Sequence, residues 1–128
     1  MRRRRRIDVV RPVADPDTLF VDAMFRDVFM EASGVESTVH EYQISLSVDA
    51  SRTITAVDVL AGSLPNAECS NAAPSAHRIV GQTTAELRDF VRKELRGTST
   101  CTHLNDLLRS LADVWWLSER LDAVVATR

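Results

Sequence analysis

The sequence predicts an α+β fold, in which an antiparallel sheet of about four strands is followed by about three helices packed on one face of the sheet. Two patterns support this prediction: the first half of the chain alternates apolar and polar residues, as strands do, and the second half repeats apolar residues at helical spacing. The length of 128 residues fits one domain. We expect a basic arm (1–6), a strand region (7–62) and a region that holds a cysteine loop and the helices (63–128).

Four segments carry the strand pattern. Residues 7–10 are rich in β-branched side chains, and a second strand begins at Leu19 and continues to about residue 30. Residues 40–48 show the clearest alternation. Its apolar face consists of His40, Tyr42, Ile44, Leu46 and Val48. Residues 53–60 form the fourth strand, which a short polar loop joins to the third as an antiparallel hairpin.

The helical spacing of apolar residues in the second half of the chain is weak at first and becomes clear toward the end. Residues 65–74 predict a loop or short helix that carries Cys69, and a weak helical segment is expected over residues 72–80. Thr83 and Glu86 have the spacing of a capping box, so a helix is expected to follow them. The last helix is predicted to be the longest, because apolar residues recur at helical spacing from Leu104 to about residue 125.

The charges of the chain are unevenly distributed. Sixteen basic and 18 acidic residues give a formal net charge of −2, and the run Arg2–Arg6 supplies much of the basic charge. We interpret this run as a basic arm that offsets the acidic remainder. The alternative is contact with phosphate, in nucleic acid or in a ligand, which is disfavoured because the rest of the chain is acidic and no aromatic residues alternate with the arginines. No apolar segment resembles a secretory signal or reaches the length of a membrane span. The expectation is therefore a cytoplasmic protein with no membrane contact.

The segment around Cys101 and His103 is the richest in reactive side chains. Both residues lie where the last helix is expected to begin, with Thr100 as its N-cap. A thiol in the first turn of a helix meets unpaired backbone N–H groups and the positive end of the helix dipole, which favour the thiolate. Because the thiolate is the reactive and metal-binding form, Cys101 and His103 are candidates both for catalysis and for metal binding.

His40 and Cys69 complete a candidate metal-binding set. Cys69 lies in the loop between sheet and helices, and His40 lies on the apolar face of the third strand, where an imidazole needs a polar partner. With Cys101 and His103 they form a donor set of two thiols and two imidazoles, which fits tetrahedral Zn²⁺. The softness of these ligands favours Zn²⁺ or iron over Mg²⁺ or Ca²⁺. The competing interpretation is that both cysteines are buried apolar residues and that His40 bonds a backbone carbonyl.

Other polar residues are interpreted more simply. Asp22 and Asp27 are expected on a solvated face rather than in a paired-carboxylate site. Asp106 lies one helical turn after His103, so it either orients that imidazole or is a surface charge. His77 is interpreted as a surface residue.

These motifs together resemble a bacterial family, domain of unknown function 2889. The shared features are an arginine-containing start, a strand that opens with His40, a P-x-x-x-C motif ending at Cys69, and the sequence C-T-H-L from Cys101 before a leucine-rich helix. The resemblance covers nearly the whole chain. The family usually has glycine before that cysteine, whereas this chain has Thr100. The family name implies no activity.

The order of elements is also similar, more distantly, to iron–sulfur scaffold proteins of the IscU/NifU type. This resemblance implies a related fold, with Cys69, Cys101 and His103 near the scaffold's ligands and His40 near its ligating aspartate. The scaffold's first cysteine has no counterpart here. The resemblance makes an iron–sulfur cluster the alternative cofactor to Zn²⁺.

Three functions follow as hypotheses. The first is a metal-binding domain built on His40, Cys69, Cys101 and His103. The second is an enzyme acting on a small molecule, in which the metal is a Lewis acid or Cys101 is a nucleophile with a histidine base. The third is a protein-interaction module with structural cysteines, using its arginines or the Trp115–Trp116 pair. The sequence identifies neither a substrate nor a partner.

Overall fold

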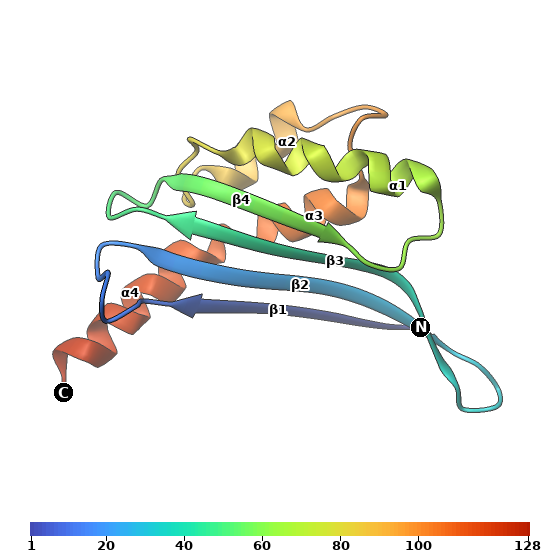
Figure 1. The fold of residues 1–128 in the computed structure, drawn as a ribbon, viewed down its shortest axis with the longest axis horizontal. Coiled ribbons are helices and arrows are strands. Elements are labelled where there is room, and N and C mark those ends of the chain that lie inside the picture. The colour runs from blue at the N-terminus through green and yellow to red at the C-terminus, as the bar shows by residue number, and fades with distance from the viewer.

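The computed structural model describes residues 1–128 and contains one antiparallel sheet in the order β1-β2-β3-β4. The strands are β1 (Arg2–Val10), β2 (Leu19–Met30), β3 (Glu36–Val48) and β4 (Ile54–Ala61). Each strand pairs with the next along the chain, so the sheet is a simple meander (Figure 1). The predicted α+β class is confirmed.

The arginine run is not a separate arm, as the sequence suggested, but the first part of β1. Arg2 to Arg6 pair in register with β2, where Arg3 lies opposite Asp27. Alternation along the strand sends Arg3 and Arg5 to the face that the helices cover and Arg4 to the open face. The sequence pattern missed this part of the strand because arginine alternates with arginine and leaves no hydropathy signal.

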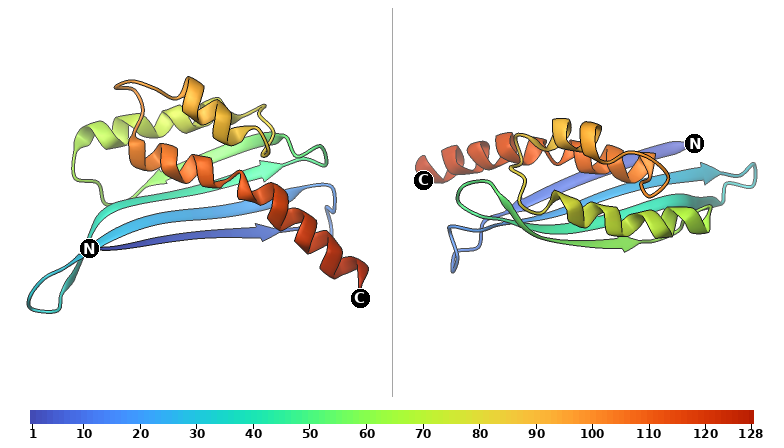
Figure 2. Two further views of the ribbon diagram at one scale, coloured as in Figure 1. Left: turned by 180° about the vertical axis from the view of Figure 1, so that it is seen from behind. Right: turned by 90° about the horizontal axis from the view of Figure 1, so that it is seen from above.

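Four α-helices and one 3₁₀-helix follow the sheet. They are α1 (Ala67–Ala72), η1 (Ala73–Ile79), α2 (Leu87–Glu94), α3 (Thr102–Ser110) and α4 (Asp113–Ala126). The segment formed by α1 and η1 lies along β4, and the other helices cover the same face of the sheet (Figure 2). None of the helices combines the length and the apolar character that crossing a bilayer requires.

The single closing helix that the sequence predicted is two helices, α3 and α4. Around Leu111 the backbone makes hydrogen bonds to the third preceding residue, and the Ser110 hydroxyl donates to the carbonyl of Leu107 at 2.6 Å. This side-chain bond competes with the regular helical ladder. The axis therefore changes direction, and α4 crosses beside β1 and extends past the edge of the sheet (Figure 2).

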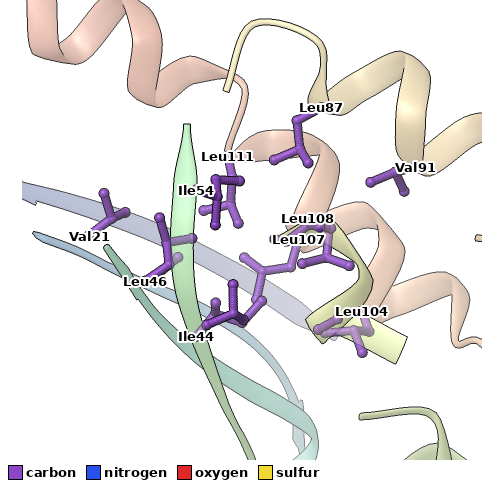
Figure 3. Close-up of a cluster of buried hydrophobic side chains, with 14 of the residues drawn as sticks. Val21, Ile44, Leu46, Ile54, Leu87, Val91, Leu104, Leu107, Leu108 and Leu111 are labelled. Atoms are coloured by element: carbon purple, nitrogen blue, oxygen red, sulfur yellow. The ribbon is translucent and has the colours of Figure 1, made fainter. Parts of the chain in front are cut away.

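The core lies between the covered face of the sheet and the helices (Figure 3). It is one cluster of 22 buried residues, to which the leucines of α3 contribute from the helix side and alternate residues of β2, β3 and β4 from the sheet side. Leu104, Leu107 and Leu108 are fully buried. Ile44, on the sheet side of the cluster, is only 1% exposed. The predicted apolar faces of β2 and β3 are thus the faces that pack.

Candidate metal centre

The four candidate ligands from the sequence line one pocket. It has a volume of about 520 Å³, and His40, Cys69, Cys101 and His103 all contribute to its wall. The pocket lies where β4 leads into α1 and where α3 begins. The structure therefore brings together residues from one strand and two helices that are far apart in the sequence.

His40 faces the pocket because of its position on β3. It lies on the side of the strand that the helices cover, directly opposite Asp27 of β2, and its side chain is 14% exposed. Between Asp27 and Val28 the register shifts, so that Val28 pairs with Thr38. Such a bulge bends the strand and redirects the side chains beside it.

Cys69 lies in α1, half-buried at the pocket wall. The Tyr42 hydroxyl donates to the Cys69 carbonyl oxygen at 2.8 Å, which ties α1 to the covered face of the sheet. Burial raises the pKa of the Cys69 thiol, and the charge of Cys101 raises it further. Burial likewise raises the pKa of the Tyr42 phenol. Both cysteines are free.

Cys101 is itself the N-cap of α3, so the expected cap, Thr100, lies one residue too early. The Thr100 hydroxyl instead donates to the carbonyl of Gly97 at 2.9 Å. The backbone of Cys101 is fixed, since its carbonyl accepts from the Asn105 N–H at 2.8 Å, while the Asn105 side chain donates to the carbonyl of Leu95. The Cys101 Sγ lies 4.0 Å from His103 Nδ1.

The two imidazoles are stacked. Their ring centroids are 4.0 Å apart with an angle of 28° between the planes, and the ring of Phe25 lies 5.8 Å from that of His103. Burial lowers the pKa of His40, and the charge of His103 lowers it further, whereas Asp27 acts in the opposite direction. Neutral imidazole is the form that binds metals.

Asp27 is the residue that sequence reasoning missed. It was expected on a solvated face, but it is 1% exposed, because it continues the buried alternation of Leu19, Val21, Ala23 and Phe25. Extending that alternation by one step would have identified it. One carboxylate oxygen of Asp27 and one nitrogen each of His40 and His103 lie within 4.8 Å of one another.

The carboxylate of Asp27 is already held by an arginine. Arg3 donates to both of its oxygens, at 2.8 and 2.9 Å. This hydrogen bonding keeps the pKa of Asp27 below its usual value despite burial. With both oxygens engaged, Asp27 is better suited to orient His40 than to coordinate an ion itself.

The remaining sequence candidates lie outside the pocket. Asp106 does not orient His103; it forms ion pairs with Arg5 and Arg109, at 2.6 and 3.2 Å. His77 is exposed in η1, as expected.

Comparison with protein families gives one match. The family model described as "Protein of unknown function (DUF2889)" matches residues 1–116. The chain belongs to the DUF2889 family. The matched range includes all the pocket residues of this DUF2889 chain, and the family is the one that the C-T-H-L motif predicted.

No curated protein and no solved structure matches this DUF2889 chain. The similarity to iron–sulfur scaffold proteins therefore stays a prediction, as does the bacterial origin. What the DUF2889 pocket offers chemically is a set of two thiols and two imidazoles, contributed by β3, α1 and the start of α3.

Proposed function

We propose that the pocket binds a transition-metal ion, Zn²⁺ in the first instance, through His40, Cys69, Cys101 and His103. The observation that supports this is that all four residues line one pocket of about 520 Å³. Cysteines that serve only as small apolar residues do not require imidazoles beside them, whereas a transition-metal site does.

The donor chemistry fits this ion. Zn–S bonds of about 2.3 Å and Zn–N bonds of about 2.0 Å in a tetrahedral site bring neighbouring ligand atoms to roughly 3.5 Å. The separation of 4.0 Å between Cys101 Sγ and His103 Nδ1 needs only a small movement to reach that value. Two thiolates would neutralise the charge of Zn²⁺, and these soft ligands disfavour Mg²⁺ and Ca²⁺.

An iron–sulfur species is the alternative occupant. Two cysteines and two histidines can hold such a cluster only in the mixed arrangement in which imidazoles replace two thiolates. The chain contains just two cysteines, which favours a single ion. A cluster would be recognised by its visible absorption and by iron and sulfide in the purified protein.

Elemental analysis of protein purified without a polyhistidine tag tests the proposal. We expect about one Zn²⁺ per chain, and loss of most of it in Cys69→Ser and Cys101→Ser. His77→Ala is the matched control, because it removes an exposed histidine outside the pocket and should leave the metal content unchanged. Metal that stays well below one equivalent after reconstitution would contradict the proposal.

Nucleophilic catalysis is the second candidate, favoured by the 4.0 Å approach of Cys101 Sγ to His103 Nδ1. It becomes the better explanation if no metal is found and Cys101 is alkylated rapidly near neutral pH, with Cys69 as the internal comparison. An inert Cys101 in a metal-free protein would instead favour an interaction module with structural cysteines.

A further inference from the structure

Three charged or polar residues form a row across the first three strands, on the face that the helices cover. Arg3 of β1 lies opposite Asp27 of β2, and Asp27 lies opposite His40 of β3. Directly opposed side chains on one face of a sheet are the closest cross-strand neighbours. The row thus leads from the arginine-rich strand to the wall of the pocket.

Arg3 is itself fixed in place. Its guanidinium makes two bonds to Asp27, and its Cζ lies 4.8 Å from the centre of the Phe25 ring. A planar arginine fork that engages both oxygens of a carboxylate restricts the rotation of that carboxylate. The orientation of Asp27 is therefore set before any ligand enters the pocket.

The Nδ1 atom of His40 faces this fixed carboxylate. It is buried and makes no hydrogen bond, and Asp27 Oδ2 lies 3.9 Å away. A buried polar nitrogen without a partner is costly, and Asp27 is the acceptor within a short movement. A neutral imidazole whose Nδ1 carries the proton toward Asp27 presents the lone pair of Nε2 elsewhere, which leaves Nε2 free to bind an ion.

We infer that Asp27, held in place by Arg3, is a positioning residue. It fixes the tautomer and the ring orientation of His40, so that Nε2 is available to bind an ion in the pocket. This inference rests on the proposed metal-binding function. It also gives the arginine-rich strand a role at the site, because Arg3 acts there through Asp27.

The first test measures metal affinity by competition of Zn²⁺ with a chromophoric chelator. Asp27→Asn should weaken binding roughly 10- to 100-fold, as loss of such partners does elsewhere. Asp22→Asn is the matched control, since it makes the same change on the open face of the same strand. Equal affinities of the wild type and Asp27→Asn would overturn the inference and leave the proposed function standing. A wild type without affinity would instead overturn the proposed function.

The second test needs no metal. The ¹⁵N chemical shifts of the His40 ring report which nitrogen carries the proton, and we expect Nδ1–H in the metal-free wild type. Asp27→Asn should shift the ring toward the other tautomer or a mixture. A wild-type His40 with its proton on Nε2 would contradict the inference.

A further pair of variants covers the case in which Asp27→Asn fails to fold. Arg3→Lys keeps the charge but cannot grip both oxygens, so it should weaken Zn²⁺ binding several-fold. Arg5→Lys is its control, because Arg5 lies on the same face of β1 and bonds Asp106 rather than Asp27. Identical affinities of the two variants would refute the role of Arg3.

Discussion

Individual side-chain oxygens fix local geometry at both ends of β3. At one end Asp27 faces His40, and at the other Asp49 closes the turn into β4. The Asp49 carboxylate accepts from the backbone N–H groups of Ser51 and Thr53, at 2.9 and 3.0 Å, and from the Ser51 hydroxyl at 2.6 Å. A single carboxylate thus satisfies three donors in a tight connection.

The turn should make stability depend on pH in a defined window. The Ser51 hydroxyl and then the Thr53 N–H lower the pKa of Asp49, so the folded state favours its ionised form. The resulting stabilisation is fully present above the unfolded-state pKa of about 3.9 and is lost as pH falls through the lower folded value. Asp49→Ala should therefore destabilise the protein at pH 7, and the difference from wild type should shrink below about pH 4. Urea unfolding across that range measures it.

The matched control for this prediction is Asp58→Ala. Asp58 is exposed on β4, and its carboxylate makes no hydrogen bond or ion pair within the chain. A difference between Asp49→Ala and wild type that stays constant down to pH 2 would show that the ionised carboxylate is not what stabilises the turn.

Sequence reasoning succeeded for residues whose neighbours signal their environment. His40 could be placed on a buried face because four apolar residues follow it at alternate positions. The prediction for Asp27 was wrong because an acidic residue without a carboxylate partner on the same strand face was interpreted as solvated. The pairing of Asp27 with Arg3 offsets the free-energy cost of removing this carboxylate from water, and a single sequence does not reveal that pairing.

At the scale of elements, β1 is an edge strand of nine residues. One side of its backbone has no neighbouring strand, and such an edge invites pairing with a second copy. In an antiparallel pairing of two copies centred on the arginine run, arginines would lie against arginines, which is unfavourable. The arginine run therefore also protects this edge.

Replacing Arg4 and Arg6 by threonine should remove that protection. Both side chains project from the open face, on the side of the sheet opposite to the Arg3–Asp27 pair. The fold should therefore be retained in the variant. We expect concentration-dependent self-association, detected by size-exclusion chromatography with light scattering. The Arg4→Lys/Arg6→Lys variant, which keeps the charge, should remain as dispersed as wild type. Threonine variants that stay equally dispersed would argue against this role.

The boundaries of the elements were harder to predict than their existence. Alternation and helical spacing identified all four strands and the apolar faces of α2 and α3. The break between α3 and α4 could not be anticipated, because neither glycine nor proline marks it and the leucine spacing continues across it. It depends on a side-chain bond from Ser110 and on how α4 meets the edge of the sheet.

At the scale of the whole molecule, stability depends on one buried cluster shared by the sheet and the helices. Leu108 of α3 is fully buried in it (Figure 3). Because helices and strands contribute to the same cluster, neither layer buries its apolar face alone. Loss of packing at this interface should therefore destabilise both layers together.

Leu108→Ala should lower the free energy of unfolding by about 2–5 kcal/mol, the usual cost of such a cavity. Urea unfolding followed by circular dichroism and by tryptophan fluorescence should give coincident transitions, in the variant as in the wild type. Leu60→Ala is the control, since Leu60 is 63% exposed and its loss should cost less than about 0.5 kcal/mol. Separate transitions for the two signals would contradict a shared core.

The pocket residues could be named from the sequence, but the arrangement around them could not. Cysteine and histidine are few in this chain, and a helix start and a strand face indicated which of them to group. The stacking of His40 on His103 and the fixed carboxylate behind them arise from contacts between distant segments. No local pattern encodes such contacts.

The distance along the chain between the pocket residues has a consequence for biosynthesis. The strands pair with their immediate neighbours, so the meander is assembled from short-range contacts, which form fast. His40 and His103, by contrast, are separated by almost half of the chain. During translation the sheet can form while α3 is still unmade or inside the ribosome. A growing chain therefore gains its complete set of donors only once the start of α3 has been made, and an ion bound by all four can be held only after the residues of the sheet have been synthesised.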